Sequence, residues 1–252
     1  MKRVSLQSAF VLHRRSYRET SYLIELFTYD YGRLTVIAKG MRTRYSSANG
    51  LLQPFIPLLV SWSGKGELKT LSQFEINGQI TSLRGSCLFA GLYLNELLVC
   101  LLPKWDAYPR LYQAYQNTMI ALYKNVLKLK VLRSFEKCLL EELGYGLLPK
   151  NDVSLHKTIA PDQYYCFMPD EGLVLCDPCK QDASTLFLGK DLLAIAREDW
   201  EDEACLRHAK RLTRLILLPL LEGKFIHSRH LFKKFNEDGH HEKTSDIIRS
   251  EY

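Results

Sequence analysis

The hydrophobic pattern changes its period near residue 82, and this change limits the possible folds more than any other feature. Before it, short apolar runs bounded by turn-forming residues occupy residues 8–12, 22–27, 33–38, 55–60 and 68–71. Runs of this length are typical of β-strands. Turn formers at residues 30–32 and 63–66 predict two hairpins. Residues 1–80 are therefore expected to form a small five-stranded β-barrel, and the OB-fold, whose open strand face binds oligonucleotides, fits this strand count.

After residue 82, apolar side chains recur every three or four residues, which is the period of an amphipathic helix. The pattern predicts helices over residues 88–99, 111–123, 131–143 and 202–221. Proline and glycine interrupt residues 149–180, where only short β-like pieces remain. The expected fold class is α+β and multidomain. It comprises a β-barrel at residues 1–80, an all-helical domain at 81–148 and 181–235, an irregular insertion at 149–180, and a flexible polar tail at 236–252.

Length and composition exclude several classes of protein. The chain has 252 residues, of which 46% are hydrophobic, so it is long enough and apolar enough to bury a core. The longest apolar runs, such as residues 215–221, are too short to span a bilayer, and residues 1–7 lack the apolar region of a signal peptide. We therefore expect a cytoplasmic protein that contacts no membrane. Its seven cysteines are an odd number, which argues against a disulfide framework.

The distribution of charge is more informative than the net charge of +6. Residues 31–66 contain no acidic residue, and residues 205–235 contain only Glu222. Two basic stretches suggest a polyanion as partner. The alternative, which charge alone leaves open, is a pair of solvated basic faces that serve solubility. The basic residues of the two stretches are Arg33, Lys39, Arg42, Arg44, Lys65, Arg207, Lys210, Arg211, Arg214, Lys224, Arg229, Lys233 and Lys234.

Ten short motifs along the chain resemble one known family. The N-terminal motifs are RETS (18–21), GRL (32–34), AKG (38–40), LQPF (52–55) and GELKTL (66–71). The later motifs are GLYLNELL (91–98), RSFE (133–136), LGYG (143–146), KRLTR (210–214) and SRHLF (228–232). In this order they resemble the RecO family of bacterial DNA repair proteins, over roughly residues 5–235.

The resemblance implies an OB-fold followed by a helical domain, interrupted by an element that is a zinc finger in some members. It implies a protein without catalytic chemistry or cofactor that binds single- and double-stranded DNA and anneals complementary strands at the nucleoid. It also implies that the protein acts with RecR and RecF to load RecA onto DNA coated with single-stranded-DNA-binding protein. The acidic, phenylalanine-ending C-terminal tail of that coating protein would dock on the helical domain.

The candidate DNA-binding residues are mainly basic. Residues 39–49 form a polar segment without core positions, so we expect an exposed, mobile loop whose cations pair with phosphates without reading sequence. An aromatic side chain on that loop, Tyr45, is placed to stack on a base. Further cations follow the first strand, flank the last hairpin and recur on one face of the helix over 202–221, where a solvated face is the alternative. The set is Arg14, Arg15, Lys39, Arg42, Arg44, Tyr45, Lys65, Lys69, Lys210, Arg211 and Arg214.

For the partner tail, the resemblance places a cation at Arg133. An aromatic side chain beside a carboxylate requires a hydrophobic pocket with a cation nearby. The apolar residues expected to form that pocket are Leu132, Phe135 and Leu139 with Leu92, Tyr93 and Leu97. The alternative is a surface arginine paired locally with Glu136 or Glu141.

A CxxC pair, Cys176 and Cys179, aligns with the second half of the family's four-cysteine zinc finger. The first half is missing, because residues 151–156 offer only His156. A structural zinc site needs four ligands in a tetrahedral array, and Cys166 fits no common zinc spacing. We therefore expect a degenerate, metal-free insertion.

An enzyme is not expected either, because the chain has no Gly-rich phosphate loop, histidine-glutamate zinc motif or GxSxG motif. The alternative to a DNA-binding mediator is a protein-binding adaptor of the repair machinery that has no annealing activity of its own.

Overall fold

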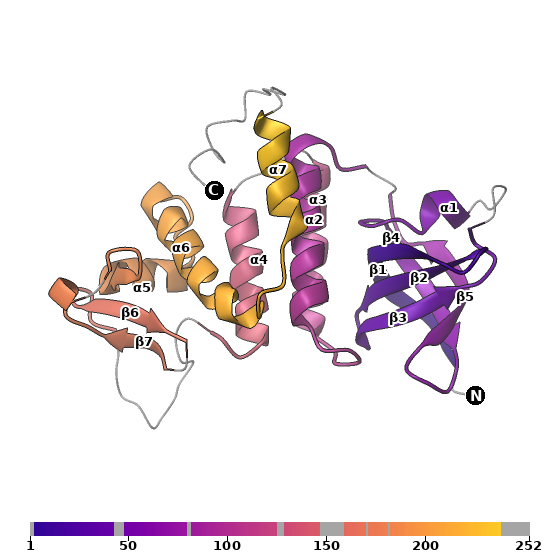
Figure 1. Ribbon diagram of the computed structural model, residues 1–252, viewed down its shortest axis with the longest axis horizontal. Coiled ribbons are helices and arrows are strands. Elements are labelled where there is room, and N and C mark those ends of the chain that lie inside the picture. The colour runs from indigo at the N-terminus through magenta and orange to yellow at the C-terminus, as the bar shows by residue number, and fades with distance from the viewer. Residues whose placement is uncertain are drawn as a thin grey trace. The chain divides into compact units, whose positions relative to one another are not determined.

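The computed structural model describes residues 3–42, 48–79, 82–124, 129–146, 159–169, 171–180 and 182–237. It divides into two compact units (Figure 1). The first comprises Met1–Leu127 with Ile226–Tyr252, and the second Lys128–Phe225. The sequence predicted a different division, in which the barrel forms one domain and all the helices belong to another.

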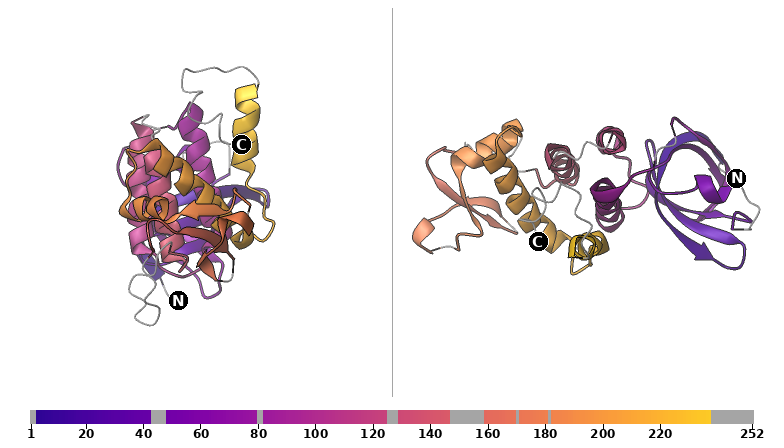
Figure 2. Two further views of the ribbon diagram at one scale, coloured as in Figure 1. Left: turned by 90° about the vertical axis from the view of Figure 1, so that its left-hand side faces the viewer. Right: turned by 90° about the horizontal axis from the view of Figure 1, so that it is seen from above.

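The first unit contains a five-stranded barrel, which the right-hand view of Figure 2 shows wrapped around one interior. The strands close in the order β1-β2-β3-β5-β4, antiparallel except for the β3–β5 pair. The five expected strands, followed by a helical region, are confirmed. Their bounds are β1 (Arg3–Tyr17), β2 (Ser21–Thr28), β3 (Gly32–Ala38), β4 (Pro57–Ser63) and β5 (Lys69–Ile76), with a short helix α1 (Ala48–Leu51) between β3 and β4.

Strand β1 is much longer than the apolar run that predicted it. It pairs with β4 along its first half and with β2 along its second, and register shifts interrupt both pairings. The second half continues through His13, Arg14 and Arg15, where no apolar run signals a strand. Backbone pairing with β2 supplies the ladder there, so polar side chains are tolerated in an extended segment.

Three helices complete the first unit: α2 (Gly85–Leu101), α3 (Pro109–Tyr123) and α7 (His227–Glu237). A buried polar chain joins two of them to the barrel. Tyr115 donates to the Asn95 side-chain oxygen at 2.6 Å, and the Asn95 amide donates to the Leu12 carbonyl at 2.9 Å. The Tyr115 ring also meets the rings of Phe10 and Phe27 edge-on. Since unsatisfied polar groups in a core are costly, this chain fixes the helices on the barrel.

Helix α7 returns to α2 although 125 residues separate their ends. Glu96 on α2 accepts hydrogen bonds from the Ser228 backbone N–H at 2.9 Å and hydroxyl at 2.6 Å. The ring of Phe89 meets that of Phe232 edge-on. The flexible tail expected from residue 236 begins within this helix, which extends to Glu237; residues 238–252 lie outside the described ranges.

In its described residues, the second unit combines three α-helices and a short 3-10 helix (Pro178–Lys180) with a three-stranded sheet. The helices are α4 (Leu129–Glu142), α5 (Gly189–Arg197) and α6 (Glu203–Leu220), and the strands are β6 (Tyr164–Met168), β7 (Gly172–Leu175) and β8 (Leu186–Leu188) in the order β7-β6-β8. The two β-like pieces of the insertion thus form a hairpin, and a third strand lies beyond the expected end at residue 180. None of the helices in the described ranges is both long and apolar enough to cross a bilayer.

Candidate nucleic-acid interface

Four cations lie near the end of β1, in the β1–β2 turn and just after β3, and we call them the loop-end cluster: Arg15, Arg18, Lys39 and Arg42. Hydrogen bonds hold the turn and the segment after β3 together. The Arg42 backbone N–H donates to the Thr20 carbonyl at 2.9 Å, and its guanidinium donates to the carbonyls of Arg18 at 2.9 Å and Glu19 at 3.4 Å. All four cations are exposed. With one acid, Glu19, in the turn, the cluster is a net positive surface.

The position of Arg14 and Arg15 differs from the expectation that they follow the first strand. Both lie within β1, opposite Ile24 and Leu23 of β2. Neighbouring strand residues point to opposite faces, and accordingly only Arg15 is fully exposed. Arg14 is half-buried, and its guanidinium carbon lies 4.4 Å from the centre of the Tyr22 ring. Arg15 is therefore the better placed of the two for a phosphate.

The segment expected as a loop without core positions is partly anchored. Met41 packs against the barrel core, and residues 48–49 already belong to α1. Lys39 and Arg42 project from the anchored part. Arg44 and Tyr45 lie outside the described residues, so their assignment stays a prediction. Sequence reasoning missed Arg18, which lies outside the acid-free stretch at residues 31–66. The sequence did contain a signal for Arg18, since a cation in a hairpin turn adds its charge to that of a basic loop beside the turn.

The two cations at the last hairpin differ in availability. Lys65 is exposed and has no hydrogen bond or ion pair within the described ranges. Lys69 is half-buried: its ammonium donates to the Gly66 carbonyl at 2.5 Å and lies 4.9 Å from the centre of the Trp105 ring. Lys69 therefore stabilises the hairpin, which makes it the weaker candidate for DNA.

Arg33, the first cation of the acid-free stretch, is neutralised from the neighbouring strand. Glu25 on β2 accepts from the Arg33 guanidinium at 3.1 Å and from the Thr35 hydroxyl at 2.6 Å. The other side of the guanidinium donates to the Leu102 carbonyl at 2.9 Å. Although residues 31–66 contain no acidic residue, a cation in this stretch can still have an acidic partner, because strand pairing brings Glu25 beside Arg33. The outer face of β2 and β3 is consequently less positive than its sequence suggests.

The basic face of α6, in the second unit, is only partly available. Arg214 and Arg207 are exposed, the latter 3.9 Å from Glu203, and Lys210 is half-buried. Arg211 instead holds the helix to the sheet. Its guanidinium donates to the carbonyls of Leu186 at 2.5 Å and Ala183 at 3.3 Å and lies 4.2 Å from the centre of the Phe187 ring. Burial lowers the pKa of this guanidinium. Arg211 is therefore the weakest DNA candidate on this face, and its assignment stays a prediction.

The residues expected to hold the partner tail fall in both units. On α4, Arg133 forms an ion pair of 2.7 Å with Glu136, which is the local pairing of the alternative, but both side chains are buried where that alternative expected a surface arginine. The neighbouring apolar residues are core side chains: Leu132, Phe135 and Leu139 are at most 8% exposed. On α2, in the first unit, Leu92 and Tyr93 are half-buried and Leu97 is fully buried. The tail pocket stays a prediction.

The cysteines of the insertion lie on and just after the β6–β7 hairpin, with Cys179 in the 3-10 helix at Pro178–Lys180. Cys166 is buried in β6, and the Cys176 backbone N–H donates to the Tyr164 carbonyl at 2.9 Å. Burial, assisted by a hydrogen bond with Cys166, raises the pKa of the Cys176 thiol to about 11. Within the described ranges no three His, Cys, Asp or Glu side chains are grouped as a metal site. His156 lies outside those ranges, so the metal-free insertion stays a prediction.

Comparison with known proteins identifies the family. Residues 1–79 match the family model "Recombination protein O N terminal", and residues 85–230 match "Recombination protein O C terminal". The "DNA repair protein RecO" of Coxiella burnetii is 45% identical over 230 residues, covering 91% of this chain and 98% of that protein.

Proteins of the same name are similar over comparable lengths. The one from Methylococcus capsulatus is 42% identical over 92% of this chain and 94% of its own length. The one from Dechloromonas aromatica is 41% identical over 93% of this chain and 98% of its own length. With both family models matched in order along one chain, this protein belongs to the RecO family of DNA repair proteins.

Proposed function

We propose that this protein binds single- and double-stranded DNA, anneals complementary strands, and helps to load RecA onto DNA coated with single-stranded-DNA-binding protein. The observation that carries the proposal is the loop-end cluster, four exposed cations on the barrel of a RecO-family chain. We also propose that the barrel is an OB-fold, an architecture that holds oligonucleotides on its strands and loops.

The chemistry of the cluster suits annealing. Arginine and lysine side chains bind phosphates and carry no sequence information, so any strand is held equally. Neutralising the backbone of two strands lowers their mutual repulsion, and the contacts of this cluster with phosphates leave base edges free to pair. No bond is made or broken in the nucleic acid, so we propose that the protein is a mediator without catalytic activity or cofactor.

The partners follow from membership of the family. We propose that the protein acts with RecR and RecF and that its helical region receives the C-terminal tail of the single-stranded-DNA-binding protein. On α4, Glu136 already balances the charge of Arg133. A tail carboxylate therefore has to compete with Glu136, and Arg133→Ala should weaken binding of an acidic, phenylalanine-ending peptide by less than tenfold in a titration.

Two measurements test the DNA-binding proposal. Fluorescence anisotropy of a labelled single strand should give an affinity that falls steeply with salt, because bound phosphates release counterions. Stopped-flow mixing of complementary strands should show faster duplex formation with the protein than without it. A protein that is folded by circular dichroism but binds no strand at low salt would be a protein-binding adaptor, and the DNA-binding proposal would fail.

A further inference from the structure

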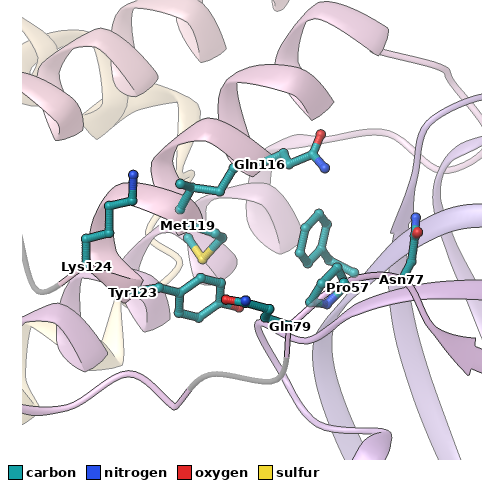
Figure 3. A pocket seen from close by; sticks show the side chains of 10 residues that line it. Pro57, Asn77, Gln79, Gln116, Met119, Tyr123 and Lys124 are labelled. Carbon is teal, nitrogen blue, oxygen red and sulfur yellow. The ribbon is translucent and has the colours of Figure 1, made fainter.

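A cavity of about 410 Å³ lies in the first unit, between α3 and the ends of β4 and β5 (Figure 3). Phe10 and Pro57 of the barrel contribute to its wall. The cavity is also lined by Asn77, Gly78 and Gln79, which follow β5, and by Gln116, Met119, Ile120, Tyr123 and Lys124 from the second half of α3. Its volume is within the range of small-molecule and cofactor sites, which begins at about 300 Å³.

The apolar part of the lining is rigid. Met119 is fully buried, and the Tyr123 hydroxyl donates to the Phe55 carbonyl, which fixes its ring. Burial raises the pKa of Tyr123 to about 12, so the hydroxyl keeps its proton at neutral pH. Ile120 is different: its side chain is 46% exposed although it is large and apolar. The cavity therefore offers fixed apolar surfaces with one apolar residue at its opening.

The polar part of the lining consists of three amides and one cation. Gln116 accepts a hydrogen bond from Gln113 at 3.2 Å, which leaves its NH₂ group for another acceptor. Over the described part of the chain, the side chains of Asn77, Gln79 and Lys124 have no hydrogen bond or ion pair. Each amide has both donors and an acceptor, whereas the ammonium only donates. In Figure 3 these groups come from both walls of the cavity.

We propose that this cavity receives one unstacked base of a bound DNA strand, with Lys124 beside its phosphate. Base edges alternate donors and acceptors, which amide side chains match, and apolar side chains cover the ring faces. A peptide carboxylate presents acceptors only, so three amides with one cation suit it less well. Because asparagine and glutamine can rotate their amides, the site tolerates any base. The inference rests on the proposed DNA binding and adds a contact to bases.

The test compares two strands of equal length, one of deoxythymidine and one of abasic units that keeps every phosphate. Stacking or enclosing one base contributes an affinity gain of roughly tenfold, so the wild type should prefer the thymidine strand by about that factor. In Asn77→Ala/Gln116→Ala the preference should fall below about twofold with the salt dependence unchanged. Asn117→Ala, an exposed amide on the same helix that does not line the cavity, is the matched control and should keep the preference.

A second variant tests the cavity without removing a polar group. Ile120→Trp places a ring at the opening and should abolish the preference while the protein stays folded, since this position is half exposed. Equal binding of both strands by the wild type overturns the base site but leaves the proposed DNA binding intact. An unchanged preference in both cavity variants also overturns it. If neither strand binds at low salt, the base site and the proposed function both fail.

Discussion

The loop-end cluster of the barrel and the basic face of α6 look equivalent in the sequence, but the structure uses their charges differently. In the cluster all four cations are exposed, and the contacts of Arg42 go to backbone carbonyls of the turn. On α6, Arg211 donates to the carbonyl of Leu186 in β8 and to that of Ala183, which precedes this strand. The difference teaches that a basic face signals a polyanion only after the cations that hold the fold together have been subtracted.

A helix face and a strand end differ in what surrounds a cation. Where a helix packs on a sheet, long side chains lie at the edge of the contact. An arginine at this edge can reach the backbone carbonyls at the end of a strand. At the β1–β2 turn the Arg42 guanidinium also donates to backbone carbonyls, but its side chain stays exposed, whereas that of Arg211 is half-buried. We expect substitutions of inward cations to affect stability and substitutions of the loop-end cluster to affect the salt dependence of DNA binding.

The largest expected effect concerns Arg33. In Arg33→Met the half-buried Glu25 loses its cation and the Leu102 carbonyl loses its donor. Leaving a partly buried carboxylate unpaired costs about 3 kcal/mol of unfolding free energy. Urea unfolding followed by tryptophan fluorescence measures this loss. Arg15→Met is the control, with a change within about 0.5 kcal/mol. Equal losses in both variants would contradict the division into inward and exposed cations.

The next effect concerns Arg211 in the second unit. Arg211→Met removes two hydrogen bonds from a charged group and its stacking on Phe187. We expect a loss of about 2 kcal/mol, discounted because the guanidinium is partly exposed. Hydrogen exchange at residues 183–188 should accelerate by a corresponding factor. Arg214→Met, three residues further along α6 and exposed, should leave that exchange unchanged. If Arg214→Met accelerates exchange equally, the contacts of Arg211 do not stabilise this segment more than those of an exposed arginine.

The third effect concerns DNA binding. In Arg15→Gln/Lys39→Gln, removal of two phosphate contacts should make the logarithmic salt slope on a single strand shallower by about 1.4, since each contact contributes about 0.7. The unfolding free energy should stay within about 0.5 kcal/mol, because both side chains are exposed. Lys210→Gln/Arg214→Gln on α6 is the matched pair. If that pair flattens the slope and the barrel pair does not, the DNA surface lies on the second unit.

Period and turn signals predicted the elements of the fold well. Each of the five strands, and each of the helices α2, α3, α4 and α6, overlaps the segment in which apolar spacing predicted it. The division into units was not predictable, because it depends on which helix buries which face. Asn95 and Tyr115 read as ordinary positions of amphipathic helices, yet their hydrogen bonds tie α2 and α3 to the barrel. Polar contacts between residues far apart in the sequence do not produce a periodic pattern from which they could be predicted.

Single residues of the candidate site were harder to predict for the same reason. Glu25 neutralises Arg33 because β2 pairs with β3, and no local sequence pattern predicts that this glutamate and arginine form an ion pair. Gly32 shows the limit most sharply. Its φ is +61°, and a Cβ atom there would lie 1.6 Å from the Asp106 carbonyl oxygen. The sequence indicated the turn but not the segment that packs against it, since Asp106 lies more than seventy residues away.

The smallest expected effect separates the two lysines of the β4–β5 hairpin, which charge alone treats as equal. Lys69→Met removes one hydrogen bond to the Gly66 carbonyl and the ammonium beside the Trp105 ring. We expect a loss of about 0.5–1 kcal/mol in unfolding free energy with little change in the salt slope. Lys65→Met should do the reverse: an unchanged stability and a slope shallower by about 0.7 if this lysine contacts a phosphate. Urea unfolding and salt-dependent anisotropy on the same two variants decide between them. Should Lys69→Met flatten the slope as much as Lys65→Met, the contacts with Gly66 and Trp105 would be too weak to keep the Lys69 ammonium from binding a phosphate. The inference from Arg33 and Arg211, that a cation bound within the fold does not contact DNA, would then hold only for guanidinium groups with several hydrogen bonds.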